Sequence, residues 1–529
     1  MDIGKLKYMF SKAEEDKNNI KTIYNSVLEL TDTFATIKDE GKVELGAQRD
    51  VDSDVLSAID TLVSYIMSSI LTKGAQWADL EVDEMRVKDM FGENAQKVIE
   101  EVNSVLSKDV NRCFKFIQNS NYYEEISKAM MSFVKLGTGC YAIRETGNTG
   151  NPFTFEYVGL DNLYIMNDTF SRPNTVFKKH PEVNGEYLLD MFGEDIILPD
   201  GLSDSDYKAT SDVFECVIPE YDENTTLTKY NYIVCDKSMT RKLLEKELAY
   251  NPFVVFRWST EEGTAWGTSI VLKQKNLLEE MNEYKTIFKK QAVNIANPPK
   301  GFIGNMELFN SISMDDGALN YFGDPSTGMV PPSIQTIGGN SSLMPLDKLI
   351  NECLVRFKGA LMVSHLTMNV QDTKYNTAEA IQTLHEMFRQ RFANTYELIN
   401  SELIQPTFMS PFIIMLKSKS LSLTEDIVPY IGIKYVSELT KADNMSKVNK
   451  IVSYMDVAYK VQELNKGGVM INLSKALPEI QELMGINPEL VPSESEILEY
   501  QEAQRQQLLQ QQMMNQGVME GDMNGGQEV

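Results

Sequence analysis

Apolar residues recur every three or four positions along roughly the first quarter of the chain, which is the spacing of amphipathic helices. The pattern predicts helices over residues 5–34, 56–70, 94–120 and 122–136. The run Gly137-Thr-Gly139 ends the last of them, because glycine adopts the left-handed backbone that terminates a helix. We therefore expect a helical N-terminal region.

The hydrophobic period changes between residues 140 and 258, where short β-rich runs are separated by Gly, Asn, Asp and Pro. Such runs predict an antiparallel α+β region with an acidic loop at 201–206. The predicted strands are 140–143, 153–158, 164–166, 213–219, 230–235 and 253–258.

A long helix is expected next, because Ser269 is a suitable N-cap and apolar residues share one face up to Asn297-Pro-Pro. A Gly-, Pro-, Asn- and Ser-rich segment then precedes a second helix at 346–362. Two helices on either side of such a segment form a projecting hairpin about 40 Å long. A two-helix stalk rarely folds alone, so this layout favours packing against other copies; an ordinary helical domain with one long loop is the alternative. The residues expected between the helices are Leu277, Met281, Tyr284 and Phe288.

A very long helix is predicted from Thr377. Pro406 and Pro411 are expected to kink this helix rather than end it, since the apolar pattern continues to Leu416. Residues 440–490 are again helical in pattern, whereas the Gln- and Met-rich tail after them is expected to be disordered.

The composition is that of a globular protein: 42% hydrophobic and 24% charged residues exclude a wholly disordered chain, and 529 residues favour several sub-domains. The 50 Lys and Arg against 76 Asp and Glu give a net charge of −26, which disfavours general DNA binding. Five scattered cysteines without a CxxC pair favour a reducing compartment. We expect a soluble protein without a secretory signal, because the apolar stretch at 55–71 is too short and too polar to span a membrane.

Motifs for catalysis and metal binding are missing from the sequence. It has no GxxxxGK[ST] loop, no GxGxxG after a strand and no HExxH, and its three histidines are too few for a His-rich site. The run Asp50-Val-Asp52-Ser-Asp54 resembles the start of a calcium loop, but Val55 and Thr61 stand at the sixth and twelfth positions. An acidic helix N-terminus is the better interpretation. We expect no catalytic residue, no metal and no cofactor.

A set of short motifs follows in order along the chain. Leu136-Gly-Thr-Gly joins a helix to a strand, Asn251-Pro-Phe-Val-Val-Phe-Arg257-Trp and Ala265-Trp-Gly267 precede the long helix that follows the β-rich region, and Thr377-Ala-Glu379 opens the last long helix. In this order they resemble the head-to-tail connector (portal) proteins of short-tailed, podovirus-type phages. The residues that carry the resemblance are Pro252, Arg257, Trp266, Gly267, Thr377 and Glu379.

The resemblance implies an α+β, mainly α protomer with a wing, a two-helix stem, a clip and a helical crown, assembling into a ring. Its regions would be 1–265, the wing with N-terminal helices and a small β-rich part; 269–296, the first stem helix; 297–345, the clip; 346–363, the second stem helix; 364–376, the tunnel loop; 377–439, the kinked wing helix and a following strand; 440–500, the crown; and 501–529, a flexible tail. The tunnel-loop residues expected to contact DNA are His365, Asn369, Gln371, Lys374 and Asn376.

The resemblance further implies a dodecamer at one capsid vertex, which is the channel for DNA packaging and ejection and not an enzyme. Expected partners are double-stranded DNA, the terminase large subunit, major capsid and scaffold proteins, tail adaptor proteins, and internal ejection or core proteins at the crown. The protein would lie in the virion, and in the host cytoplasm during assembly. Its acidic charge suits a channel, because a basic lining would bind DNA and act as a brake.

Two other classes stay open. A cytosolic helical scaffold or adaptor without a DNA role need not form a closed dodecamer, so the particle mass distinguishes it. An enzyme whose site is assembled from distant acidic residues would show metal-dependent nuclease activity.

Overall fold

The computed structural model describes residues 2–32, 51–83, 87, 95–148, 150–203, 208–221, 227–296, 300–303, 333–336, 342–366, 387–388, 390–436, 448, 451–453 and 455. The chain divides into two units, Met1–Ser437 and Glu438–Val529. Nearly all described residues belong to the first unit, to which the following account applies. The predicted crown and tail lie almost wholly outside the described residues.

The four helices predicted for the N-terminal region are present. They are α1 (Ile3–Thr31), α2 (Ser53–Ile70), α4 (Ala95–Asn119) and α5 (Tyr122–Leu136). Helix α5 ends at Gly137, whose φ of 101° is left-handed and whose N–H donates to the Phe133 carbonyl at 2.9 Å. The predicted glycine stop is confirmed.

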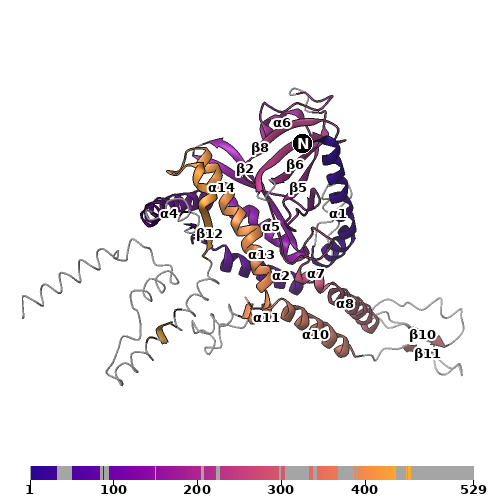
Figure 1. The fold of residues 1–529 in the computed structure, drawn as a ribbon. Coiled ribbons are helices and arrows are strands. Elements are labelled where there is room, and N and C mark those ends of the chain that lie inside the picture. The colour runs from indigo at the N-terminus through magenta and orange to yellow at the C-terminus, as the bar shows by residue number, and fades with distance from the viewer. Residues whose placement is uncertain are drawn as a thin grey trace, which may run out of the picture. The chain divides into compact units, whose positions relative to one another are not determined.

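Two antiparallel sheets form the β-rich part. One has the strand order β3-β2-β9, and the other has the order β4-β5-β6-β7-β8. Helix α1 packs on the five-stranded sheet, where Leu6 and Ala13 meet apolar side chains such as Phe177 and Cys216 (Figure 1). The strands are β2 (Thr138–Asn148), β3 (Asn151–Tyr157), β4 (Leu163–Met166), β5 (Thr175–Val183), β6 (Ser211–Tyr221), β7 (Leu227–Asp236), β8 (Lys242–Leu248) and β9 (Phe253–Arg257).

Six of these eight strands overlap the predicted ones, whereas β5, β8 and the short helix α6 (Gly185–Phe192) were missed. The polar centre of β5, Lys178-Lys-His180, does not read as a buried strand, yet the structure buries Lys178 and His180. The sequence of β8, Lys-Leu-Leu-Glu-Lys-Glu-Leu, has the spacing of a helix turn rather than a strand.

The predicted projecting hairpin is a pair of helices lying side by side, α8 (Lys275–Ala296) and α10 (Met344–Ala360) (Figure 1). The short helix α7 (Ile270–Lys273) precedes α8, and the Ser269 hydroxyl accepts from the Leu272 N–H at 2.8 Å, which confirms the predicted N-cap. Between the two helices, β10 (Lys300–Ile303) pairs antiparallel with β11 (Ser333–Thr336).

The last long helix continues across both prolines, as predicted. It consists of α13 (Ala393–Leu398), a π-helical segment η3 (Ile399–Ile404) and α14 (Gln405–Lys417), with Pro411 inside α14. The wider π turn directly precedes Pro406, where a proline would otherwise clash with the turn before it. After the 3₁₀ turn η4 (Glu425–Tyr430), β12 (Ile431–Tyr435) pairs with the unpredicted strand β1 (Ala78–Val82).

No helix in the described parts of the chain is long and apolar enough to cross a membrane. All five cysteines are buried and unpaired, in keeping with their interpretation as small apolar side chains.

Candidate functional site: the Arg257 junction and the projecting helix pair

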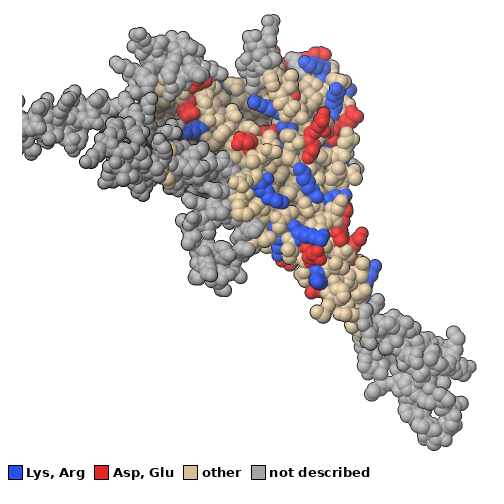
Figure 2. All heavy atoms as spheres, turned by 60° about the horizontal axis from the view of Figure 1, so that its bottom comes forward, with Lys and Arg blue, Asp and Glu red and all other residues tan. Residues whose placement is uncertain are grey.

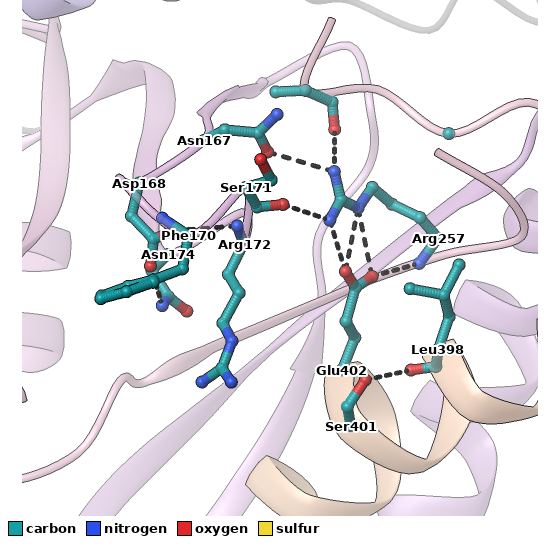
Figure 3. A network of polar contacts seen from close by, with 12 residues as sticks. Asn167, Asp168, Phe170, Ser171, Arg172, Asn174, Arg257, Leu398, Ser401 and Glu402 are labelled. Carbon is teal, nitrogen blue, oxygen red and sulfur yellow. Dashed lines mark hydrogen bonds and ion pairs between the residues drawn. The ribbon is translucent and has the colours of Figure 1, made fainter. Parts of the chain in front are cut away.

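Arg257, the last residue of β9, is buried with 2% of its surface exposed. Its Nε and Nη2 donate to the Glu402 carboxylate on η3, and Glu402 Oε2 also accepts from the Arg257 backbone N–H at 3.0 Å. Nη1 donates to Asn167 Oδ1 at 3.1 Å and to the Ala265 carbonyl at 3.3 Å, and Nη2 donates to the Ser171 carbonyl at 2.9 Å (Figure 3). One guanidinium therefore joins β9, the β4–β5 loop and the long helix.

The carboxylate of Glu402 is held in an apolar setting. Burial raises its pKa above the ordinary value of 4.5, and the hydrogen bonds and charge of Arg257 oppose that rise. A buried charge of this kind is tolerated only when it is paired and hydrogen-bonded, as it is here.

Gly267 lies against Gly137 at the start of β2. A Cβ on Gly267 would stand 2.0 Å from the Gly137 carbonyl oxygen, so only glycine fits. The Gly267 N–H donates to Thr138 Oγ1 at 2.9 Å, and its carbonyl accepts from Tyr24 Oη at 2.8 Å. The neighbouring Trp266 is buried edge-to-face against the Tyr24 ring. We call Arg257, Trp266, Gly267, Gly137 and Glu402 the junction; it fixes the chain just before α7 and α8.

The N-terminus of α2 holds the helix pair through ion pairs. Asp52 caps α2 by accepting from the Asp54 N–H at 2.7 Å, and it also pairs with Lys285 of α8. Asp54 pairs with Lys358 of α10 at 2.9 Å. The interpretation of this acidic run as a helix N-terminus is confirmed, and no metal-binding group of side chains occurs in the part of the chain that the structure describes.

The helix pair leaves large apolar side chains exposed. Exposure rises to 65% at Val293, 67% at Val355 and 80% at Met344. The exposed large apolar residues described on α8 and α10 are Ile287, Val293, Ile295, Met344, Leu349 and Val355. Within the described residues, these side chains have no apolar neighbour sufficient to bury them, which is typical of a protein–protein contact surface.

A model of one protein family, the bacteriophage head to tail connecting protein, matches residues 4–491. The chain belongs to this family. The comparison with curated proteins found no match. Membership in this family makes the protein a structural connector of the phage virion. It is located at the capsid, and capsid and tail proteins are its partners.

The connector motif residues of the sequence divide into two groups. Arg257, Trp266 and Gly267 meet in the junction, and the Pro252 carbonyl, at the start of β9, accepts from the Ile143 N–H of β2 at 2.7 Å. Thr377 and Glu379 lie outside the described residues. Sequence analysis missed Glu402, Gly137 as the partner of Gly267, and Tyr24, because each is distant in sequence from its partner.

The residues predicted to pack between the two helices differ in burial. Met281 is buried, whereas Leu277, Tyr284 and Phe288 are partly exposed; α10 contributes the buried residues Cys353 and Phe357. The tunnel loop was predicted over residues 364–376, but helix α11 (Val363–Leu366) includes the first three of them, among them His365. Asn369, Gln371, Lys374 and Asn376 lie outside the described residues.

A second buried polar network joins the two sheets of the connector. Glu215 of β6, fully buried, accepts from both terminal nitrogens of Arg144, from His180 Nε2 at 2.9 Å and from Tyr232 Oη at 2.7 Å. Burial alone would raise the pKa of Glu215, but the charge of Arg144 and the hydrogen bonds from His180 and Arg144 hold it well below 4.5. Burial lowers the pKa of His180 below 6.5, although Glu215 opposes this shift.

This network predicts a pH-dependent stability that His180 controls. An unfolded histidine takes up a proton near pH 6.5, whereas the folded one does so only at lower pH, so stability falls as the pH drops below about 6.5. The variant His180→Gln stays neutral and keeps a donor for Glu215. Urea unfolding at about pH 7.5 and about pH 5 should show a smaller loss of stability for the variant than for the wild type. Equal losses of stability in the two proteins would show that His180 does not cause this pH dependence.

Proposed function

We propose that the protein is the portal of a short-tailed phage. Twelve copies form a ring at one capsid vertex, DNA enters and leaves through its channel, and the ring docks the terminase and later the tail proteins. The observation that carries the proposal is the projecting pair α8–α10, which leaves apolar residues on its outer faces. A head-to-tail contact that repeats with rotation buries such faces and closes a ring.

The regions of the protomer take their roles from this proposal. Helices α8 and α10 are the stem, the segment between them with β10 and β11 is the clip, and the sheets with α1 to α5 and α14 are the wing. Residues 440–500 form the crown, and 501–529 form the tail. The clip is the proposed dock for terminase and tail.

The charge of the protein fits a conduit rather than a DNA clamp. Twelve copies at −26 carry a formal charge of −312. Figure 2 shows Lys and Arg interspersed with Asp and Glu on one face of the described residues, without a broad basic patch. Each lysine–phosphate contact adds affinity by counterion release, so a sparse set of lysines keeps DNA mobile.

Lys374 of the proposed tunnel loop is one of the lysines proposed to contact DNA. Phage heads that carry the Lys374→Glu variant should retain less DNA after packaging. Unchanged DNA retention would show that Lys374 does not contact DNA.

The ring proposal predicts that charge on the outer stem faces blocks assembly. Val293 and Val355 are 65% and 67% exposed in the protomer, so Val293→Asp with Val355→Asp should leave its stability unchanged. In a ring the same positions become buried, where an unpaired carboxylate is costly. Mass photometry should find protomers of 59.9 kDa for the double variant.

The matched control is Ile197→Asp, which charges an apolar residue that is 51% exposed but lies away from the helix pair. This variant should assemble like the wild type. Persistent rings in the Val293/Val355 double variant would show that α8 and α10 do not form the subunit contact.

A further inference from the structure

A cleft of about 780 Å³ opens between the β4–β5 loop and the helical segments η3 and α14. One wall is aromatic and is formed by Phe170, Tyr221 and Tyr230. The opposite wall comes from α14 and is apolar, with Met409 and Ile413 among its residues. A cleft of this size and lining accommodates several side chains of an extended peptide.

The loop that forms one side of the cleft is held rigidly. The Asp168 carboxylate accepts from the backbone N–H groups of Phe170 and Arg172 at 2.8 and 2.9 Å, and from Asn174 Nδ2 (Figure 3). It also accepts from Tyr221 Oη. Ser171 has a φ of 60°, a left-handed backbone conformation that is strained for a residue with a Cβ. Its carbonyl is fixed by Arg257, so the junction maintains this strained turn.

The strained turn carries two exposed side chains, Phe170 and Arg172. Phe170 is 50% exposed and packs edge-to-face with the Tyr221 ring, at a centroid distance of 5.7 Å. Arg172 is exposed, and its guanidinium has no hydrogen-bond or ion-pair partner among the residues that the structure describes. In Figure 3 no dashed line joins this guanidinium to the residues drawn. Exposed aromatic and arginine side chains on a rigid loop are the usual centres of protein interfaces.

Among the described residues that line the cleft, one positively charged group is available. Asp168 is surrounded by four donors, and Glu402 is paired with Arg257. The Arg172 guanidinium is therefore the cation that a ligand can reach, in a chain whose net charge is −26. A planar guanidinium binds a carboxylate through two parallel hydrogen bonds, which favours an acidic ligand over a basic one.

We propose that this cleft docks an extended segment of a capsid or tail protein in which an Asp or Glu stands beside a bulky apolar residue. The carboxylate pairs with Arg172, and the apolar side chain inserts between Phe170 and Met409. A connector must bind its capsid and tail partners through surfaces other than the one it uses for its own assembly. The inference rests on family membership and on this cleft, and it does not depend on the portal ring.

The test is selection of a displayed library of random 12-residue peptides on the purified full chain. Bound peptides should be enriched in Asp or Glu next to Phe, Tyr, Leu or Met. In fluorescence anisotropy, Arg172→Ala and Phe170→Ala should each weaken the best peptide about tenfold or more. A repeated selection on Arg172→Glu should yield peptides with Lys or Arg in place of the acid.

Arg241→Ala is the matched control, because Arg241 is an exposed arginine paired with Asp200 at 2.9 Å and does not line the cleft. Its affinity for the selected peptide should equal that of the wild type. Failure to enrich acidic–apolar peptides, or binding that Arg172→Glu leaves unchanged, would overturn the proposal. Loss of self-association in Arg172→Glu would assign the cleft to a second copy instead, and would overturn it equally.

Discussion

Replacing Arg257 with Met is expected to lower the free energy of unfolding by about 3–5 kcal/mol. The change leaves the Glu402 carboxylate buried without its charge partner, and it also removes the donors to Asn167 and to the Ala265 and Ser171 carbonyls. Removing one member of a buried pair costs far more than the pair contributes, because the remaining charge keeps its desolvation penalty. Urea unfolding followed by circular dichroism measures the effect.

The double variant Arg257→Met with Glu402→Leu separates the two causes. It removes the orphaned charge as well, so most of the lost stability should return. Arg356→Ala, which breaks an exposed pair with Glu352, should change the stability by less than about 0.5 kcal/mol. A double variant as unstable as Arg257→Met would show that the uncharged contacts of Arg257, and not the charge of Glu402, dominate.

Gly267→Ala is expected to destabilise the protein by more than about 3 kcal/mol, and most of the variant should be insoluble on expression. The added Cβ would lie 2.0 Å from the Gly137 carbonyl oxygen and 3.0 Å from Arg257 Cβ. Both contacts are with atoms on or close to the backbone, so neither can move aside as a flexible side chain would. The soluble fraction and the urea midpoint are the measurements.

Gly359→Ala provides the matched control on the same chain. A Cβ at Gly359 meets nothing within 4 Å, and the residue lies inside α10. Alanine favours a helix over glycine by about 1 kcal/mol, so this variant should be as stable as the wild type or slightly more stable. Equal stability of the Gly267 and Gly359 variants would show that the chain segments around Gly137 and Gly267 can separate without cost.

Local features of the fold followed from the sequence. The periodicity of the first four helices, the glycine stop after Leu136 and the Ser269 cap depend on neighbours within a few residues. The strand β5 escaped prediction because Lys178 and His180 look solvated until Glu156 pairs with Lys178 and Glu215 accepts from His180, both from other strands. A Glu at position 215, between Phe214 and Cys216 in an apolar strand, was the available signal for this network.

The candidate sites were predictable only in part. The motif drew attention to Arg257, but its partner Glu402 is 145 positions away, a distance over which a single sequence carries no pairing information. Apolar residues occur on more than one face of α8, so the pattern could select Met281 as inward-facing without showing that Val293 is exposed. The cleft depends on the Asp168 turn and on α14, which meet only in the folded chain.

We expect the connector to assemble into a closed ring through α8 and α10. Negative-stain electron microscopy of the purified full-length wild type, with the particle mass measured on the same sample, tests it most directly. We expect rings with a central channel and a mass of about 720 kDa, the value for twelve copies of 59.9 kDa. Protomers, open filaments or compact particles without a channel would contradict it.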